Sequence, residues 1–297
     1  MTPPIWSPRF TLTPAISRSL KQIEVARVLM DTVILPIEGY AVLRARARVR
    51  ASSSSTFIDG SRLTLEQAHA VIADETAEIA GMEDNVAVVR NYSKALQKAE
   101  EWAKMSLPLT ETLIGRFHRL AITGKSSRPT LLRKKKSSVK NSLTGDVVYL
   151  PPRPEDLPEL IAALEIWTEE ARSSDLPIPV IAALVHYKLA AIHPFNDGNG
   201  RTTRLCADFI LMRDGYSFSG LIMPEEQYSE DLDSYYQALN VHAEKIDYYE
   251  GRAEADLTFW LEYYTASLVQ SCEAAFLEMA AYIASTPAKS RRKRKKS

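Results

Sequence analysis

The sequence predicts an all-α fold with a single short β-hairpin. Through most of the chain, apolar residues recur at the spacing of one helix face. Three prolines stand near expected helix starts, where a missing backbone amide costs little. Strand character is convincing only at Val147, Val148, Tyr149 and Leu150, which follow a Thr-Gly turn and precede two prolines.

The helices are expected in two regions and precede a basic tail. In an N-terminal helical region, residues 1–105, they span 14–31, 38–55, 64–79 and 85–105. In a second domain, residues 106–285, they span 109–122, 154–173, 177–192, 199–214, 228–243 and 253–284. Residues 138–142 are placed to pair with the strand as a hairpin. We expect residues 286–297 to be disordered, because they hold seven bases and no acid.

Composition narrows the class of protein. The 297 residues can bury a large core, and 45% hydrophobic with 25% charged residues is an ordinary globular balance. Residues 1–288 carry 30 bases against 37 acids, so nucleic acid is not expected as a partner except through the tail. No secretory signal opens the chain, no apolar run is long enough to span a membrane, and two cysteines make no disulfide framework. We therefore expect a cytoplasmic protein without a membrane partner.

The most informative stretch is residues 193–204, His-Pro-Phe-Asn-Asp-Gly-Asn-Gly-Arg-Thr-Thr-Arg. A residue before proline leaves the α region, so the preceding apolar helix should end near His193. Gly198 and Gly200 allow a tight turn and close approach of a ligand. The next helix should start directly after this turn, so that its first amides form an anion site. Arg201 and Arg204, three apart, should point from one helix face toward the same anion.

These residues match every defined position of His-x-Phe-x-Asp/Glu-Gly-Asn-Gly-Arg-x-x-Arg, the core motif of the Fic family. The chain resembles that family over most of its length. The resemblance implies a Fic helical core with a hairpin flap, which transfers AMP from ATP to a Ser, Thr or Tyr hydroxyl of a protein. The target can be the protein itself, and a homodimer is left open. An ordinary helix–loop–helix turn with a solvated arginine pair is the alternative interpretation of the motif.

The motif residues have expected roles in such a reaction. His193 is the candidate general base for the attacking hydroxyl. Asp197 would hold Mg²⁺, a hard cation that takes oxygen ligands. The two arginines would neutralise the phosphates that leave as pyrophosphate. The residues expected to bind the nucleotide are Gly198, Asn199, Gly200, Arg201, Thr202, Arg204 and, by the resemblance, Tyr235. The strand Val147, Val148, Tyr149 and Leu150 resembles the Fic flap, which adds a segment of the target by strand pairing.

Three further features of the sequence qualify this interpretation. Relatives often carry an asparagine eight positions after the tyrosine equivalent to Tyr235, where this chain has Ala243, so contacts to the base or ribose do not carry over. The lysines at 134–136 depart from the family pattern, so neither does the identity of the target. We interpret His186 as a packing residue, although a zinc pair with His193 is conceivable from their spacing.

Residues 55–60 resemble the inhibitory motif Ser/Thr-x-x-x-Glu-Gly/Asn of Fic proteins that regulate themselves. In that motif the glutamate pairs with the second arginine, equivalent to Arg204, and blocks the γ-phosphate of ATP. Here Ser55 is retained, but Asp59 replaces the glutamate and is one methylene shorter. We therefore expect looser pairing and partial inhibition. A plain helix end, with Gly60 after the last turn, is the alternative.

Two competing functions remain from the sequence. Some Fic relatives transfer another phosphate-containing group, and an idle Fic scaffold could bind protein or nucleic acid through its tail. The intact His193 and Asp197 argue against an idle scaffold, and the unaltered glycines and arginines favour a nucleoside triphosphate.

Overall fold

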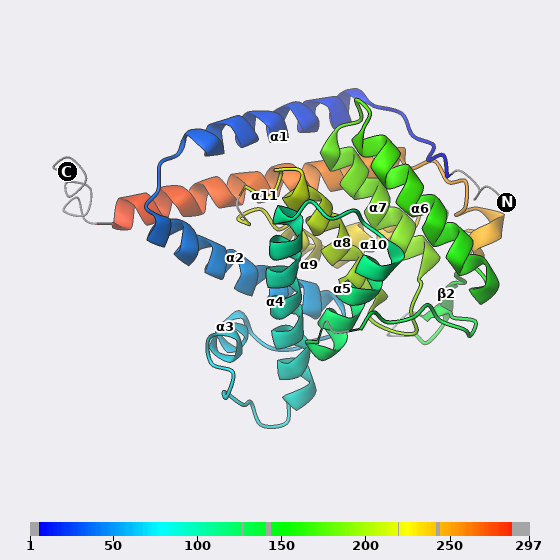
Figure 1. Ribbon diagram of the computed structural model, residues 1–297, viewed down its shortest axis with the longest axis horizontal. Coiled ribbons are helices and arrows are strands. Elements are labelled where there is room, and N and C mark those ends of the chain that lie inside the picture. Colours follow the sequence, from blue (N-terminus) through cyan, green and yellow to red (C-terminus); the bar gives the residue numbers. More distant parts are fainter. Residues whose placement is uncertain (1–5, 126–127, 141–143, 219, 242–243, 287–297) are drawn as a thin grey trace.

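The computed structural model describes residues 6–125, 128–140, 144–218, 220–241 and 244–286. The described part is helical apart from one two-stranded hairpin, which confirms the predicted fold class (Figure 1). The helices are α1 Pro14–Thr32, α2 Ile37–Ile58, α3 Leu65–Ala73, α4 Glu83–Lys104, α5 Glu111–Thr123, α6 Leu157–Arg172, α7 Ile178–Ile192, α8 Asn199–Arg213, α9 Glu225–Glu230, α10 Leu232–Leu239 and α11 Thr258–Ser285. Short 3-10 turns lie at Pro154–Asp156 and Tyr248–Glu250. The strands β1 Val139–Lys140 and β2 Val147–Tyr149 pair antiparallel.

One expected helix ends early and another divides, because aspartate carboxylates accept hydrogen bonds from nearby backbone amides. The helix expected over 64–79 stops at Ala73, since the Asp74 carboxylate accepts bonds from the amide and hydroxyl of Thr76 at 2.8 and 2.7 Å. The helix expected over 228–243 divides into α9 and α10. Asp231 leaves the helical conformation and caps α10 by accepting a bond from the Ser234 amide at 3.0 Å. Ala243 and the tail from residue 287 lie outside the described residues.

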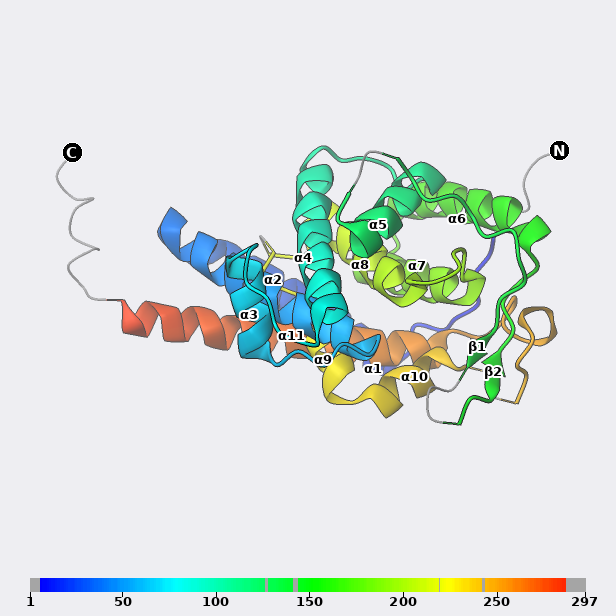
Figure 2. The same cartoon turned by 90° about the horizontal axis from the view of Figure 1, so that it is seen from below.

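The core is built around α7 and α8. Apolar residues surround α7 on all sides, so it is stable only when other helices enclose it. The views show α4, α5 and α6 on one side of the α7–α8 pair and α11 on the other (Figures 1 and 2). The apolar core is continuous across the boundary expected near residue 106: Leu43 and Tyr92 belong to the same cluster as Trp260.

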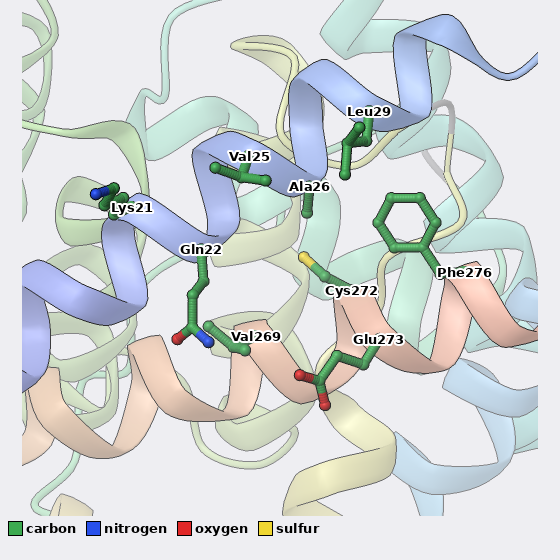
Figure 3. A pocket seen from close by; sticks show the side chains of 9 residues that line it. All are labelled: Lys21, Gln22, Val25, Ala26, Leu29, Val269, Cys272, Glu273 and Phe276. Carbon is green, nitrogen blue, oxygen red and sulfur yellow. The ribbon is translucent and has the colours of Figure 1, made fainter.

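The N-terminal helices α1 and α2 pack on different helices of this core. α1 lies along α11. A shallow hollow of about 300 Å³ lies between the two helices and is lined by apolar side chains such as Val25, Leu29 and Phe276 (Figure 3). α2 packs on α4 and α9 and ends against α8. Within the part of the chain that the structure covers, none of the helices is long and apolar enough to cross a bilayer.

Candidate active site

The loop between α7 and α8 brings the motif residues together. His193 ends α7 in the left-handed conformation, with φ 51°, and its amide donates to the Leu189 carbonyl at 3.0 Å. Phe195 is 1% exposed and anchors the loop in the core. Gly198 has φ 68° and directly precedes α8, which starts at Asn199. The predicted helix end, turn and helix start are therefore confirmed, and the first amides of α8 lie beside the turn.

The side chain of Asn199 holds the loop closed. Its Oδ1 accepts a bond from the Phe195 amide and its Nδ2 donates to the Phe195 carbonyl, both at 2.9 Å. The residue is 3% exposed. The amide group is therefore engaged within the protein, and the side chain of Asn199 sets the shape of the loop rather than facing outward.

Steric limits explain both glycines, and Thr202 supports the helix start. A Cβ on Gly198 would lie 2.4 Å from Cδ1 of Ile122, and one on Gly200 would lie 2.8 Å from Oδ1 of Asp59. Thr202 is 2% exposed, and its hydroxyl donates to the Gly198 carbonyl at 2.8 Å. The absence of a side chain at Gly200 thus lets Asp59, at the end of α2, approach the first turn of α8 closely.

His193 is half-buried, and one of its two ring nitrogens has a hydrogen-bond partner. Its Nδ1 lies 3.3 Å from the carbonyl oxygen of Ala190, which can only accept, so Nδ1 carries the proton. Nε2 is then the acceptor. Burial lowers the pKa of His193, opposed by the bond to Ala190. The imidazole is therefore neutral at neutral pH, the form that a general base requires.

Arg201 and Arg204 converge on one carboxylate, that of Asp59. Arg201 Nε donates to Oδ2 at 2.9 Å, and Arg204 donates through one terminal nitrogen to Oδ1 at 2.8 Å. The arginine side chains are 8% and 2% exposed, against 21% for Asp59. Burial is the largest single influence and lowers the pKa of Arg204, but Asp59 together with Tyr235 and Tyr92 raises it overall.

Ser55, one turn before Asp59, completes this contact. Its hydroxyl accepts a bond from Arg204 Nε at 2.7 Å, and its carbonyl accepts another at 2.8 Å. The expectation of a loose contact is wrong. α2 continues to Ile58 and carries Asp59 close to α8, so the shorter side chain reaches both arginines. The contact with Arg201 is additional to the expected pairing, which involves Arg204 alone.

Tyr235 is buried behind the arginine pair. Its hydroxyl lies 3.0 Å from Nε2 of His186, and burial raises the pKa of Tyr235, so the phenol stays protonated. His186 is fully buried and its ring contacts those of Trp260 and Tyr264, as a packing residue would. Farther in, burial and the neighbouring Glu225 raise the pKa of Asp208.

Residues 108–211, which include the whole motif, match the model of the Fic/DOC family. The chain carries a Fic domain. Among solved structures, it resembles a Fic family protein from Desulfovibrio desulfuricans G20 with a TM-score of 0.74 and 26% identity, over 92% of this chain and 77% of that one. A Fic domain containing signaling protein from Bacteroides thetaiotaomicron VPI-5482 shares the fold, with a TM-score of 0.72, 24% identity, and coverage of 91% and 99%.

Curated relatives of this Fic domain carry an enzyme name. "Protein adenylyltransferase Fic" of Drosophila grimshawi is 35% identical over 186 residues, which are 59% of this chain and 35% of the relative. The protein of the same name from Drosophila melanogaster is 34% identical over 59% of this chain and 34% of its own length. The chain thus spans about a third of the length of these relatives.

The hairpin of the Fic domain lies next to the loop that carries His193. Val147 and Val148 are 40% and 39% exposed, whereas Tyr149 is buried and its hydroxyl donates to the Ala191 carbonyl at 2.6 Å. Leu150 lies just beyond β2, and its amide donates to the Ile246 carbonyl at 2.8 Å. The exposed stretch of the expected flap is thus Val147 and Val148, and Tyr149 and Leu150 fix its end. Of residues 138–142, which were expected to pair with β2, Val139 and Lys140 do so, Ser138 lies just before β1, and 141 and 142 lie outside the described residues.

Two positioning residues of the Fic domain carry no sequence signal of their own. His118 donates through Nε2 to the Asp197 carbonyl at 2.8 Å, and its Nδ1 accepts a bond from the Thr130 hydroxyl at 2.8 Å. Burial lowers the pKa of His118, which keeps this tautomer neutral. Arg133 donates through Nε to the His193 carbonyl at 2.8 Å. Both act on backbone carbonyls, which every residue has, so no side-chain pattern announces them.

Proposed function

We propose that this chain is an ATP-dependent protein adenylyltransferase that its own α2 holds at rest. The observation that carries the proposal is the occupied arginine pair: Arg201 and Arg204 hold the Asp59 carboxylate beside the neutral, half-buried His193. An oxyanion of the chain itself thus lies where an anionic ligand would bind. The names of the curated relatives support the same reaction.

The reaction would need one base and a stabilised leaving group. The oxygen of a protein hydroxyl forms a bond to the α-phosphorus of ATP, and its proton passes to Nε2 of His193. The bond from that phosphorus to the bridging oxygen breaks, and pyrophosphate leaves. Arg201 and Arg204 would stabilise the negative charge that develops on the leaving phosphates, since fixed guanidinium groups need no reorganisation during the reaction.

Asp197 suits a magnesium ion. Its side chain is exposed at the loop, and the bond from His118 to its carbonyl fixes the backbone. One carboxylate together with phosphate oxygens and waters is a usual donor set for Mg²⁺. When bound, the ion would neutralise phosphate charge.

Charge balance explains how ATP could displace the inhibitor. Two guanidinium groups face the single carboxylate of Asp59, so the pair keeps an excess of one positive charge. A triphosphate carries several negative charges and satisfies both arginines more fully. We therefore propose that Asp59 and Ser55 restrain the enzyme and that ATP competes with them.

We also expect the enzyme to work in the cytoplasm, in keeping with its free, buried cysteines.

The test combines the donor label with release of Asp59. Asp59→Gly should raise self-labelling from ATP labelled at the α-phosphate by about tenfold or more. A tenfold effect needs only about 1.4 kcal/mol, and each hydrogen bond to a charged group contributes about 1.5–3 kcal/mol. Asp74→Gly is the matched control, because Asp74 also follows a helix but contacts neither arginine.

Label at the γ-phosphate should not transfer in any variant. Transfer from the γ position would mean kinase chemistry and would refute the proposal. Asp59→Gly with unchanged labelling and unchanged ATP affinity would leave Asp59 as an ordinary helix-end residue. If no variant transfers any label, the idle scaffold is the better account.

A further inference from the structure

Arg133 is a buried cation that faces backbone carbonyls. It lies between α5 and β1 and is 2% exposed. Its Nε donates to the His193 carbonyl at 2.8 Å, one terminal nitrogen to the Lys135 carbonyl at 2.9 Å, and the other to the Pro152 carbonyl at 2.5 Å. Its own amide donates to the Pro194 carbonyl at 2.9 Å. No carboxylate of the described residues forms an ion pair with it.

A buried arginine without a carboxylate partner is energetically costly if its only role is to fill space. Burial lowers the pKa of Arg133, which shows that its charge is held against a desolvation cost. An apolar side chain could fill the same space without that cost. What only a guanidinium supplies is several donors in one rigid plane, here directed at three separate stretches of backbone.

Two of the three backbone segments that Arg133 bonds are the loop that carries His193 and the chain just after the flap strand β2. The left-handed conformation of His193 is costly for a non-glycine residue and persists only where its surroundings fix it. The bonds from Arg133 to the carbonyls of His193 and Pro194 hold the two peptide groups that directly follow that strained position. The bond to Pro152 fixes the chain three residues after β2.

We propose that Arg133 is a positioning residue that holds the general base in register with the flap. The inference rests on the proposed function. A target segment on the exposed part of β2 would present its hydroxyl to Nε2 of His193. Arg133 sets the distance between these two elements without touching the substrate. The bond from Tyr149 to the Ala191 carbonyl is a second connection between the same elements.

The charge of Arg133 also acts on the base. Burial is the main cause that lowers the pKa of His193, and Arg133 lowers it further. The Ala190 carbonyl and the carboxylates of Asp59 and Asp197 oppose this shift. Removing the charge at residue 133 should therefore raise the pKa of His193, which a purely structural role would not require.

The test uses Arg133→Lys and Arg133→Gln in the full chain with Asp59→Gly. Arg133→Lys keeps the charge but loses the planar set of donors. It should slow self-transfer at saturating ATP by about 10- to 100-fold, the cost of a small misplacement. The ATP concentration for half-saturation should change less than twofold, because neither arginine of the anion site contacts Arg133. Arg213→Lys is the control: its side chain is also buried, but it bonds the Leu107 carbonyl and two carboxylates at the far end of α8.

Arg133→Gln separates charge from position. In this variant the acid limb of the pH–rate profile should move to higher pH, whereas in Arg133→Lys it should stay in place. The NMR titration of the His193 ring should show the same difference without any activity. An unchanged transfer rate in Arg133→Lys, or an unchanged His193 titration in Arg133→Gln, would overturn the assignment. If the Asp59→Gly parent transfers nothing, the proposed function fails, and the NMR titration alone decides on Arg133.

Discussion

At the scale of the residue, His193 and the arginine pair carry different parts of the proposed reaction. His193→Ala should abolish transfer, because no other group would take the proton of the hydroxyl. ATP affinity should stay within a few-fold, since Arg201 and Arg204 face the anion. Labelling and nucleotide titration measure the two effects separately. His69→Ala is the control, because His69 is exposed on α3. Retained labelling in His193→Ala would remove this residue as the base.

The pH dependence follows from the lowered pKa of His193. The neutral ring is the active form, and burial keeps it neutral below the ordinary value of 6.5. The transfer rate should therefore stay level as the pH falls through 6.5 and should decline only at lower pH, as the ring takes up a proton. A pH series of initial rates at saturating ATP and Mg²⁺ checks this. A decline centred above pH 6.5 would contradict the burial argument.

Individual residues differed in how far the sequence could place them. The spacing of Arg201 and Arg204 on one helix face fixed their direction, so their convergence could be anticipated. The contact of Asp59 with Arg201 could not, because it depends on how far α2 extends toward α8. Arg133 and His118 act on carbonyl groups contributed by distant segments, and such partners have no sequence pattern.

At the scale of the element, the joint between α7 and α8 depends on Gly198. Gly198→Ala should destabilise the protein in two ways. Its φ of 68° costs an alanine about 1–2 kcal/mol, and a Cβ 2.4 Å from Ile122 adds about 1–3 kcal/mol of overpacking. Gly215→Ala isolates the first cost, because Gly215 has φ 85° but open space around a Cβ. Denaturant melts of both variants measure the difference, and equal losses would show that Ile122 moves aside freely.

Helix existence was easier to predict than helix length. Apolar periodicity places α7 and α8 to within a residue, because their ends are set by a proline and by glycines. The ends at Asp74 and Asp231 were missed. There a carboxylate binds nearby amides, and this local bond outweighs an apolar pattern that continues past it.

At the scale of the whole molecule, the N-terminal segment is part of the fold that supports the site. α1 lies along α11, and α2 joins the core that α7 and α8 also share (Figure 1). The sequence shows that each helix has an apolar face, but it does not show which faces meet. The docking of α2 between α4 and α9 therefore came from the structure, although residues 55–60 already suggested where α2 ends.

The contact of Asp59 with both arginines also links nucleotide affinity to the position of α2. The carboxylate and a triphosphate cannot occupy the pair together, so ATP would bind only the open population, in which the end of α2 has withdrawn. The apparent dissociation constant is then the intrinsic one divided by the open fraction. Each 1.4 kcal/mol that favours the closed population weakens apparent affinity about tenfold.

The same linkage runs in reverse, because a ligand that selects the open population must increase it. Saturating ATP should accelerate amide hydrogen exchange in the last turn of α2, where Ser55 and Asp59 lose their partners. Asp59→Gly should exchange quickly without ATP and gain little from it, and α6, remote from the arginines, serves as the internal reference. Unchanged exchange in α2 at saturating ATP would mean that nucleotide and Asp59 do not compete. Without competition, residues of α2 that never touch the nucleotide would have no influence on ATP affinity. Under competition, each residue that packs α2 against the core affects the ATP concentration that the protein needs.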